Sequence, residues 1–205
     1  KLVQAGVAAV GKMNDEIVLE IAHQMGRPVR YGGEFGGFNE RASYLADIAE
    51  QALAPIVVED SDAFRRVIKR VAHGLVLVVA PWNYPYMTAI NTVAPALIAG
   101  NAVMLKHASQ TPLVGERMAA AFHSVGIPQD VFQNVFLDHQ ATSALIADRA
   151  FGFVNFTGSV DGGKAMEAAA TLTGVEHSAI NQRIYSRVQV GVFHDIASVS
   201  YPHLT

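Results

Sequence analysis

Hydrophobic and polar positions divide the first part of the chain into helical stretches. Residues 3–25 repeat apolar side chains at intervals of three and four, and a glycine and a proline follow, which predicts one helix that ends near Met25. Residues 31–38 hold four glycines and predict a turn. Residues 40–53 resume the helical spacing, so a second long helix is expected there.

Strand patterns take over from residue 56. Segments 56–58 and 64–71 combine β-branched and charged residues and predict strands or a hairpin. The apolar run 75–79, stopped by Pro81, is typical of a parallel strand covered on both faces. Helices and strands then alternate, with helices predicted at 87–99, 111–125, 141–146 and 160–170 and strands at 102–105, 132–137 and 151–156. This alternation predicts an α/β fold with a doubly wound, mostly parallel sheet and an N-terminal helical portion.

Composition narrows the classes of function. The 205 residues are 51% hydrophobic and carry a net charge of -3 with no basic cluster, so neither nucleic acid nor an anionic membrane is expected as a partner. Apolar stretches fall short of the roughly 20 residues that a membrane helix needs, and no signal-peptide pattern is present, which predicts a cytoplasmic location. The eight histidines lack zinc-binding spacing and there is no cysteine, so no metal site, disulfide or thiol nucleophile is expected.

Three motifs follow predicted strands. The first is the proline-stiffened turn Ala80-Pro81-Trp82-Asn83-Tyr84-Pro85, which suits a fixed hydrogen-bond donor but equally a surface turn with a packed tryptophan. The second is Lys106, either a ligand for a ribose or phosphate or a solvated lysine. The third, Phe156-Thr157-Gly158-Ser159, opens a helix whose N–H groups favour a pyrophosphate, although glycines also serve as plain punctuation.

The third motif nearly matches a P-loop. Gly158, Gly163 and Lys164 satisfy G-x-x-x-x-G-K, but Ala165 stands where a P-loop has the serine or threonine that holds magnesium. A phosphate-binding protein of that type is therefore a second alternative. No G-x-G-x-x-G sequence is present.

Taken in order, the motifs resemble those of the NAD(P)-dependent aldehyde dehydrogenase superfamily. The resemblance runs from about Glu16 to Val175 and includes Pro95 to Lys106, Gln110-Thr111-Pro112 and Gly126-Ile127-Pro128. It implies a Rossmann-like cofactor domain, NAD or NADP as cofactor, oxidation of a small-molecule aldehyde to a carboxylic acid, and a homo-oligomer in the full-length form. It implies Asn83 as the catalytic oxyanion donor and a set of cofactor-binding residues: Val79, Ala80, Pro81, Trp82, Lys106, Ser109, Thr157, Gly158, Ser159 and Gly162.

Several positions depart from the family pattern. Ser109 replaces a glutamate that repels a 2′-phosphate, so NADP should be tolerated at least as well as in glutamate-bearing relatives. Residues 135–138 lack a glycine that usually follows the third strand, which predicts an altered adenine pocket. After Val175 the general-base segment Glu-Leu-Gly-Gly, expected near 179–180, is absent, and Glu176 lacks its context.

The resemblance also divides the chain. Residues 1–70 form an N-terminal helical segment of the same domain, 71–175 the NAD(P)-binding core, and 176–205 an atypical tail in which Arg183-Ile184-Tyr185-Ser186 appears without the nucleophilic cysteine. We therefore expect a truncated family member that is inactive alone, with the sheet ending after its fourth strand. The alternative is a non-catalytic dinucleotide-binding or oligomer-forming module.

Overall fold

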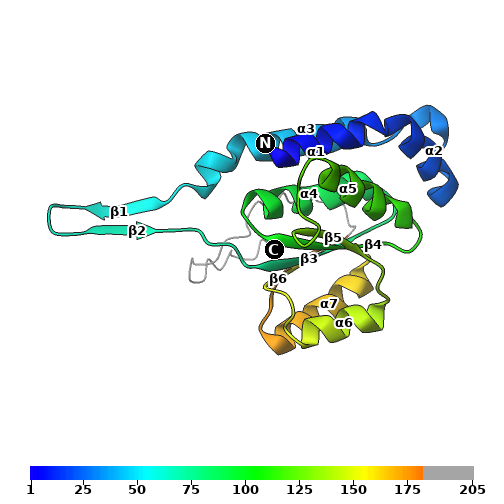
Figure 1. The fold of residues 1–205 in the computed structure, drawn as a ribbon. Coiled ribbons are helices and arrows are strands. Elements are labelled where there is room, and N and C mark those ends of the chain that lie inside the picture. The colour runs from blue at the N-terminus through cyan, green and yellow to red at the C-terminus, as the bar shows by residue number, and fades with distance from the viewer. Residues whose placement is uncertain (182–205) are drawn as a thin grey trace, which may run out of the picture.

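A five-stranded parallel sheet forms the centre of the computed structural model, which describes residues 1–181 (Figure 1). Its strands stand in the order β5-β4-β3-β6-β7, with the bounds β3 (Leu75–Ala80), β4 (Ala102–His107), β5 (Phe132–Val135), β6 (Phe153–Gly158) and β7 (Glu176–Asn181). The chain runs outward from β3 to β5 and then returns to pair β6 with β3. Ligands of doubly wound sheets bind where the strand order reverses in this way, outside the carboxyl ends of the strands.

Helices cover both faces of this sheet. One face carries α4 (Pro85–Ile98) and α5 (Pro112–Ser124), and the other carries α6 (His139–Ala147) and α7 (Val160–Thr173) (Figure 1). Side chains of β3 alternate between the two cores: Val76 and Val78 belong to the larger cluster, while Leu77 and Val79 belong to the cluster that includes α7. The predicted α/β, doubly wound class is confirmed, and two-sided burial explains the uninterrupted apolar run.

The N-terminal segment forms a further helical layer over α4 and α5. It consists of α1 (Leu2–Lys12), α2 (Asn14–Met25), the short 3-10 helix η1 (Val29–Tyr31) and α3 (Phe35–Leu53). The prediction of one helix over 3–25 is wrong, because the chain bends at Met13, two residues after Gly11. The predicted turn 31–38 also ends early: α3 takes in Gly37, where a Cβ would collide with the Met87 side chain, so the glycine permits close packing of α3 on α4.

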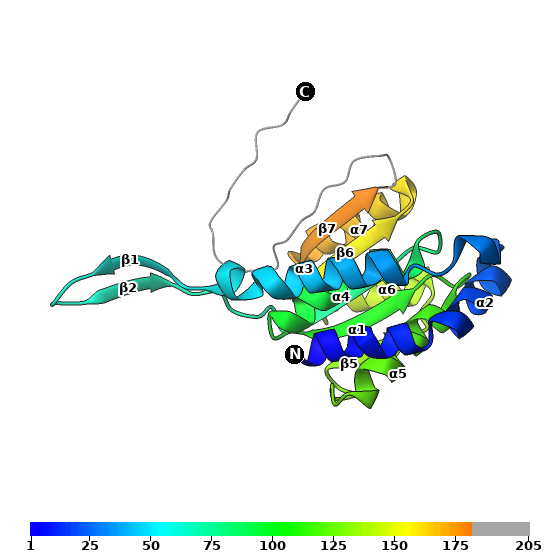
Figure 2. The same ribbon diagram turned by 90° about the horizontal axis from the view of Figure 1, so that it is seen from above.

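The predicted strand pair is confirmed as a hairpin. Strands β1 (Ile56–Asp60) and β2 (Arg65–Ile68) are antiparallel and project away from the body of the molecule (Figures 1 and 2). Ile56, Val58 and Phe64 are exposed on it. A two-stranded hairpin is marginally stable in water by itself, so these apolar side chains suit an arm that contacts another surface.

The sheet does not end at four strands as expected. Strand β7 pairs in parallel with β6 and forms the edge of the sheet (Figure 2). Its sequence, Glu176-His177-Ser178-Ala179-Ile180-Asn181, has few apolar residues and so lacks the pattern of a buried strand. Its place in the sheet comes instead from backbone pairing with β6. The sequence features noted at 183–186 lie outside the described residues. Among residues 1–181, no helix combines the length and apolar character required to cross a membrane.

Candidate dinucleotide and oxyanion site

Three strand ends that carry the sequence motifs are neighbours in the sheet. Val79 of β3 pairs with Lys106 of β4 on one side and with Phe156 of β6 on the other. The turns that follow these strands therefore open at one edge, at the point where the strand order reverses. This register brings all the cofactor residues implied by the resemblance to that edge or to the turns beyond it.

Lys106 is the cation of this edge. It lies two residues beyond Met104, which packs with the cluster on the α7 face, so its side chain belongs to that face as well. Only 7% of Lys106 is exposed, and burial lowers the pKa of its ammonium, while Asp138 opposes that shift. Ser109 lies three residues further on and is exposed. A buried ammonium beside an accessible hydroxyl suits the ribose or phosphate oxygens of a nucleotide.

The β6–α7 turn is built from local contacts. Ser159 caps α7, and its Oγ accepts a hydrogen bond from the Gly162 N–H at 3.2 Å. A Cβ at Gly158 or Gly162 would lie 2.6 or 2.7 Å from Phe156 Cζ. The two glycines therefore make room for the Phe156 ring. The groups available to a ligand are therefore the N–H groups at the start of α7 and the Ser159 Oγ. This combination of groups fits a phosphate.

The P-loop alternative does not fit this turn. Gly163 and Lys164 are already inside α7, which begins at Val160, so they do not belong to a loop that could wrap a phosphate. Gly163 is buried and Lys164 is exposed. With Ala165 next in the chain, the segment supplies neither the loop nor the hydroxyl that the motif requires.

The β3–α4 turn carries the candidate oxyanion donor. Pro81 is buried, Asn83 is half-buried, and Trp82 is 44% exposed at the edge of the sheet. Helix α4 starts with Tyr84 as its N-cap residue, which supplies no side-chain cap, and Pro85 as its first residue. The free N–H groups of the first turn therefore depend on partners from elsewhere in the chain.

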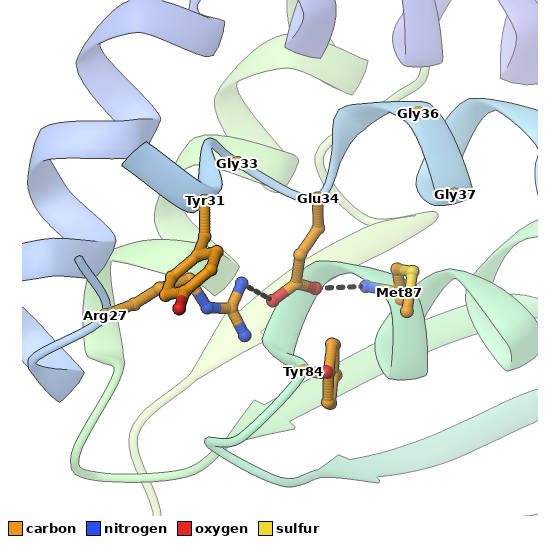
Figure 3. A pocket seen from close by; sticks show the side chains of 8 residues that line it. All are labelled: Arg27, Tyr31, Gly33, Glu34, Gly36, Gly37, Tyr84 and Met87. Carbon is orange, nitrogen blue, oxygen red and sulfur yellow. Dashed lines mark hydrogen bonds and ion pairs between the residues drawn. The ribbon is translucent and has the colours of Figure 1, made fainter. Parts of the chain in front are cut away.

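Glu34 of the N-terminal segment supplies an acceptor for one of these N–H groups, and Arg27 holds the carbonyl side of the turn (Figure 3). Arg27 donates to the backbone carbonyl oxygen of Asn83 at 2.7 Å and to Glu34 Oε1 at 2.6 Å. Glu34 Oε2 accepts from the backbone N–H of Met87 at 2.8 Å. Burial raises the pKa of Glu34, against the lowering effects of the Met87 N–H and Arg27. Sequence analysis missed both residues, because no local pattern connects them to a turn more than 50 positions away.

A pocket of about 480 Å³ opens beside this group. It is lined by Arg27, Tyr31, Gly33, Glu34, Gly36, Gly37, Tyr84 and Met87, and Figure 3 shows the two tyrosine rings on either side of the ion pair. The Arg27 guanidinium lies 5.0 Å from the centre of the Tyr84 ring. The guanidinium therefore interacts with both a carboxylate and an aromatic ring at the wall of this pocket.

His107 holds the same turn from the β4 side. Its Nδ1 accepts hydrogen bonds from the Ala108 N–H at 2.9 Å and the Thr111 hydroxyl at 3.1 Å, which leaves the proton on Nε2. Nε2 then donates to the Pro85 carbonyl oxygen at 3.3 Å. Burial lowers the pKa of His107 to about 4, so the imidazole is neutral near pH 7.

Within residues 1–181, neither a thiol nor an acidic residue at the expected general-base position completes the site. Position 180, where the resemblance expects a general base, pairs with Thr157 at the carboxyl edge but is isoleucine. Glu176 pairs with Phe153 at the opposite end of the strand. Residues 1–181 contain no group of three or more side chains placed to hold a metal ion, and the sequence has no cysteine.

Comparison with known proteins gives a family match over most of the chain. The model of the "Aldehyde dehydrogenase family" matches residues 1–179. A probable succinate-semialdehyde dehydrogenase [NADP(+)] of Synechocystis sp. is 37% identical over 127 residues, which are 62% of this chain and 28% of that protein. The chain thus spans less than a third of that relative's length.

Solved structures share the fold. The NAD-dependent aldehyde dehydrogenase from Sinorhizobium meliloti superposes with a TM-score of 0.81 at 27% identity, over 88% of this chain and 36% of that one. The succinic semialdehyde dehydrogenase from Streptococcus pyogenes, solved in complex with NADP+, gives a TM-score of 0.76 at 26% identity, over 86% and 40% of the two chains. Both are between two and three times as long as the region they share with this chain.

Proposed function

Because the chain belongs to the aldehyde dehydrogenase family, we propose that it forms the NAD(P)-binding and oxyanion-donating part of an enzyme that oxidises an aldehyde to a carboxylic acid. The observation that carries this proposal is the register of β4, β3 and β6, which aligns Lys106, the Asn83 turn and the Ser159 turn at one edge. Each supplies a donor suited to a different part of the reaction.

The donor set at this edge fits a dinucleotide. Lys106 and Ser109 would bond the adenosine ribose, and the Ser159 hydroxyl with the N–H groups of the first turn of α7 would bind the pyrophosphate. The nicotinamide ribose would be bordered by Val79, Ala80, Pro81 and Trp82. The phosphates would lie beside Thr157, Gly158 and Gly162. The bound nicotinamide would supply the hydride acceptor.

Asn83 would act on the aldehyde itself. Its side-chain amide would donate a hydrogen bond to the oxygen that becomes negatively charged when a nucleophile attacks the carbonyl carbon, an interaction that gains strength in the transition state. The adjoining pocket of about 480 Å³ offers space for the rest of the aldehyde between Tyr84 and Tyr31. The family members named as semialdehyde dehydrogenases make an aldehyde with a second polar group one candidate substrate class.

Cofactor choice would depend on Ser109. The exposed serine adds no negative charge to the loop after Lys106, so a 2′-phosphate meets no carboxylate from position 109, although Asp138 acts on Lys106 from another loop. We therefore expect NADP to bind at least as well as NAD. Tight binding of NAD with no binding of NADP would contradict this assignment.

The 205-residue chain should not turn over aldehydes by itself. The family reaction needs a thiolate nucleophile to form the intermediate from which hydride leaves, and the sequence has no cysteine. The alternative function is therefore a dinucleotide-binding or oligomer-forming module. The hairpin β1–β2, with its exposed Ile56, Val58 and Phe64, supports the second part of that alternative.

Titration with NADPH tests the proposal. Binding should change the emission of the reduced nicotinamide in a saturable way, and Lys106→Met should weaken this binding about 10-fold, since one charge-assisted hydrogen bond contributes roughly 1.5 kcal/mol. Lys164→Met, a lysine exposed on α7, is the matched control and should bind normally. An aldehyde with NADP should yield no NADPH; measurable production would overturn the expected inactivity.

A further inference from the structure

The turn that carries Asn83 is held by a charged pair from a distant segment. Arg27 and Glu34 lie 56 and 53 residues from their backbone partners at Asn83 and Met87. The side chains of the pair are 13% and 3% exposed, so both charges are largely removed from water. Figure 3 shows the Arg27 guanidinium facing the carboxylate of Glu34, which faces Met87 on its other side.

Each contact of the pair fixes a different atom of the turn. Arg27 donates to the Asn83 carbonyl oxygen and lies against the ring of the next residue, Tyr84. Glu34 accepts the N–H of Met87 in the first turn of α4. The residues from Asn83 to Met87 are thus held at both ends. The 2.6 Å contact between Arg27 and Glu34 links the two side chains that hold them. The backbone from which the Asn83 side chain projects is therefore held at two points.

We propose that Arg27 and Glu34 are positioning residues that preorganise Asn83, through its backbone carbonyl and the start of α4, for donation to the oxyanion. The proposal rests on the oxyanion role of Asn83 under the proposed function. Neither residue touches the reacting atoms. An amide that is already oriented pays no reorganisation cost as charge develops on the substrate oxygen.

Energetics favour a positioning role over a purely stabilising one. Taking two charges out of water costs free energy that their attraction often only offsets, so a buried ion pair is weak evidence of fold stability. Burial is the largest influence on Glu34 and raises its pKa, which means that the folded chain disfavours the ionised carboxylate. The contact between Arg27 and Glu34 nevertheless lies at the turn that carries the candidate donor.

Trp82 offers a direct test because it is the chain's only tryptophan and precedes Asn83. Glu34→Gln keeps the shape but leaves one acceptor oxygen, which cannot serve both Arg27 and the Met87 N–H. Time-resolved anisotropy in the absence of urea should show the amplitude of local Trp82 motion rising about two-fold, and the urea midpoint should fall because Arg27 loses its buried partner. Arg27→Lys should also loosen Trp82, since an ammonium lacks the fork that spans Glu34 and the Asn83 carbonyl.

Arg41→Lys is the matched control. Arg41 also joins α3 to α4, through a 3.1 Å bond to Asn91 Oδ1, but it does not touch the turn, so Trp82 motion should be unchanged. Unchanged Trp82 motion in Glu34→Gln would overturn the proposal. So would an equal rise of Trp82 motion in Phe153→Ala, a variant destabilised elsewhere in the core, because the added motion would then reflect general loss of stability. Failure of NADPH binding in the parent chain would instead count against the proposed function.

Discussion

Two helices that begin at the same edge of the sheet complete their first turns in different ways. In α7 the third residue, Gly162, donates its N–H to Ser159, three positions earlier. In α4 the third residue, Met87, donates to Glu34, 53 positions away in sequence. The first is an ordinary N-cap, whereas the second replaces the missing cap of Tyr84 with a buried carboxylate from another layer of the fold.

The difference fits the two roles proposed for these turns, which are phosphate binding and donation to the oxyanion. A turn that presents N–H groups to a phosphate needs only a helix start and a small cap, which adjacent residues can provide. A turn that aims one amide at one oxygen needs its backbone fixed from outside. The Asn83 turn accordingly receives Arg27 and Glu34 from the N-terminal segment and His107 from β4.

Truncating Phe156 should break the locally built turn. Its ring fills the space that Gly158 and Gly162 leave open, so Phe156→Ala should cost about 3–5 kcal/mol of unfolding free energy and weaken NADPH binding. Phe153→Ala, on the other face of β6, should cost a similar amount without changing cofactor affinity. Equal loss of affinity in both variants, measured at matched stability in urea, would remove the specific role assigned to the Phe156 ring.

Acid should destabilise the β3–α4 turn that carries Asn83, because it protonates His107. The pKa of this buried imidazole is lowered from 6.5 to about 4, so protons bind the unfolded chain first and stability falls as the pH drops from 6.5 towards 4. The full difference corresponds to about 3 kcal/mol. His107→Gln keeps a donor for the Pro85 carbonyl but does not titrate. Urea denaturation at several pH values should show a shallower loss in the variant; parallel curves would contradict the assignment.

Removing the α7 cap should have a smaller effect. Ser159→Ala deletes the acceptor of the Gly162 N–H and should lower stability by about 1 kcal/mol, while Ser159→Gly should cost only a few tenths. Trp82 motion should be unchanged in both, since the Asn83 turn has its own supports. Denaturation curves and anisotropy decays on the same samples provide the check, and a coupled change at Trp82 would show that the two turns are not independent.

Exchanging Ser109 for glutamate should leave the fold nearly untouched and alter only cofactor choice. The residue is exposed, so the unfolding free energy should change by less than about 0.5 kcal/mol. Titrations with NADPH and with NADH, and displacement of each by NADP, should show that Ser109→Glu binds the phosphorylated cofactors more weakly than the parent chain does. Unchanged NADP affinity would mean that the 2′-phosphate does not approach this loop.

The comparison also separates what the sequence could predict from what it could not. The buried strand 75–79, the alternating helices and strands, and the helix start at Ser159 follow from patterns within a few residues of each other. Partners for the Asn83 turn could not be found this way, because Arg27 and Glu34 meet it only after the N-terminal layer has packed. Strand β7 was missed for a related reason, because pairing with β6 places it in the sheet without an apolar run, whereas the bend at Met13 has a local signal, Gly11, that was passed over.

Native-state hydrogen exchange at two amides tests the difference between the turns most directly. The Met87 N–H, bonded to a buried carboxylate, should exchange only through global unfolding, whereas the Gly162 N–H, bonded to an exposed serine, should exchange through local opening at a much faster rate. Protection at Met87 should fall in Glu34→Gln and remain in Ser159→Ala. Equal protection of the two amides in the parent chain, or protection of Met87 that survives loss of the Glu34 charge, would contradict the account of a turn fixed from a distance.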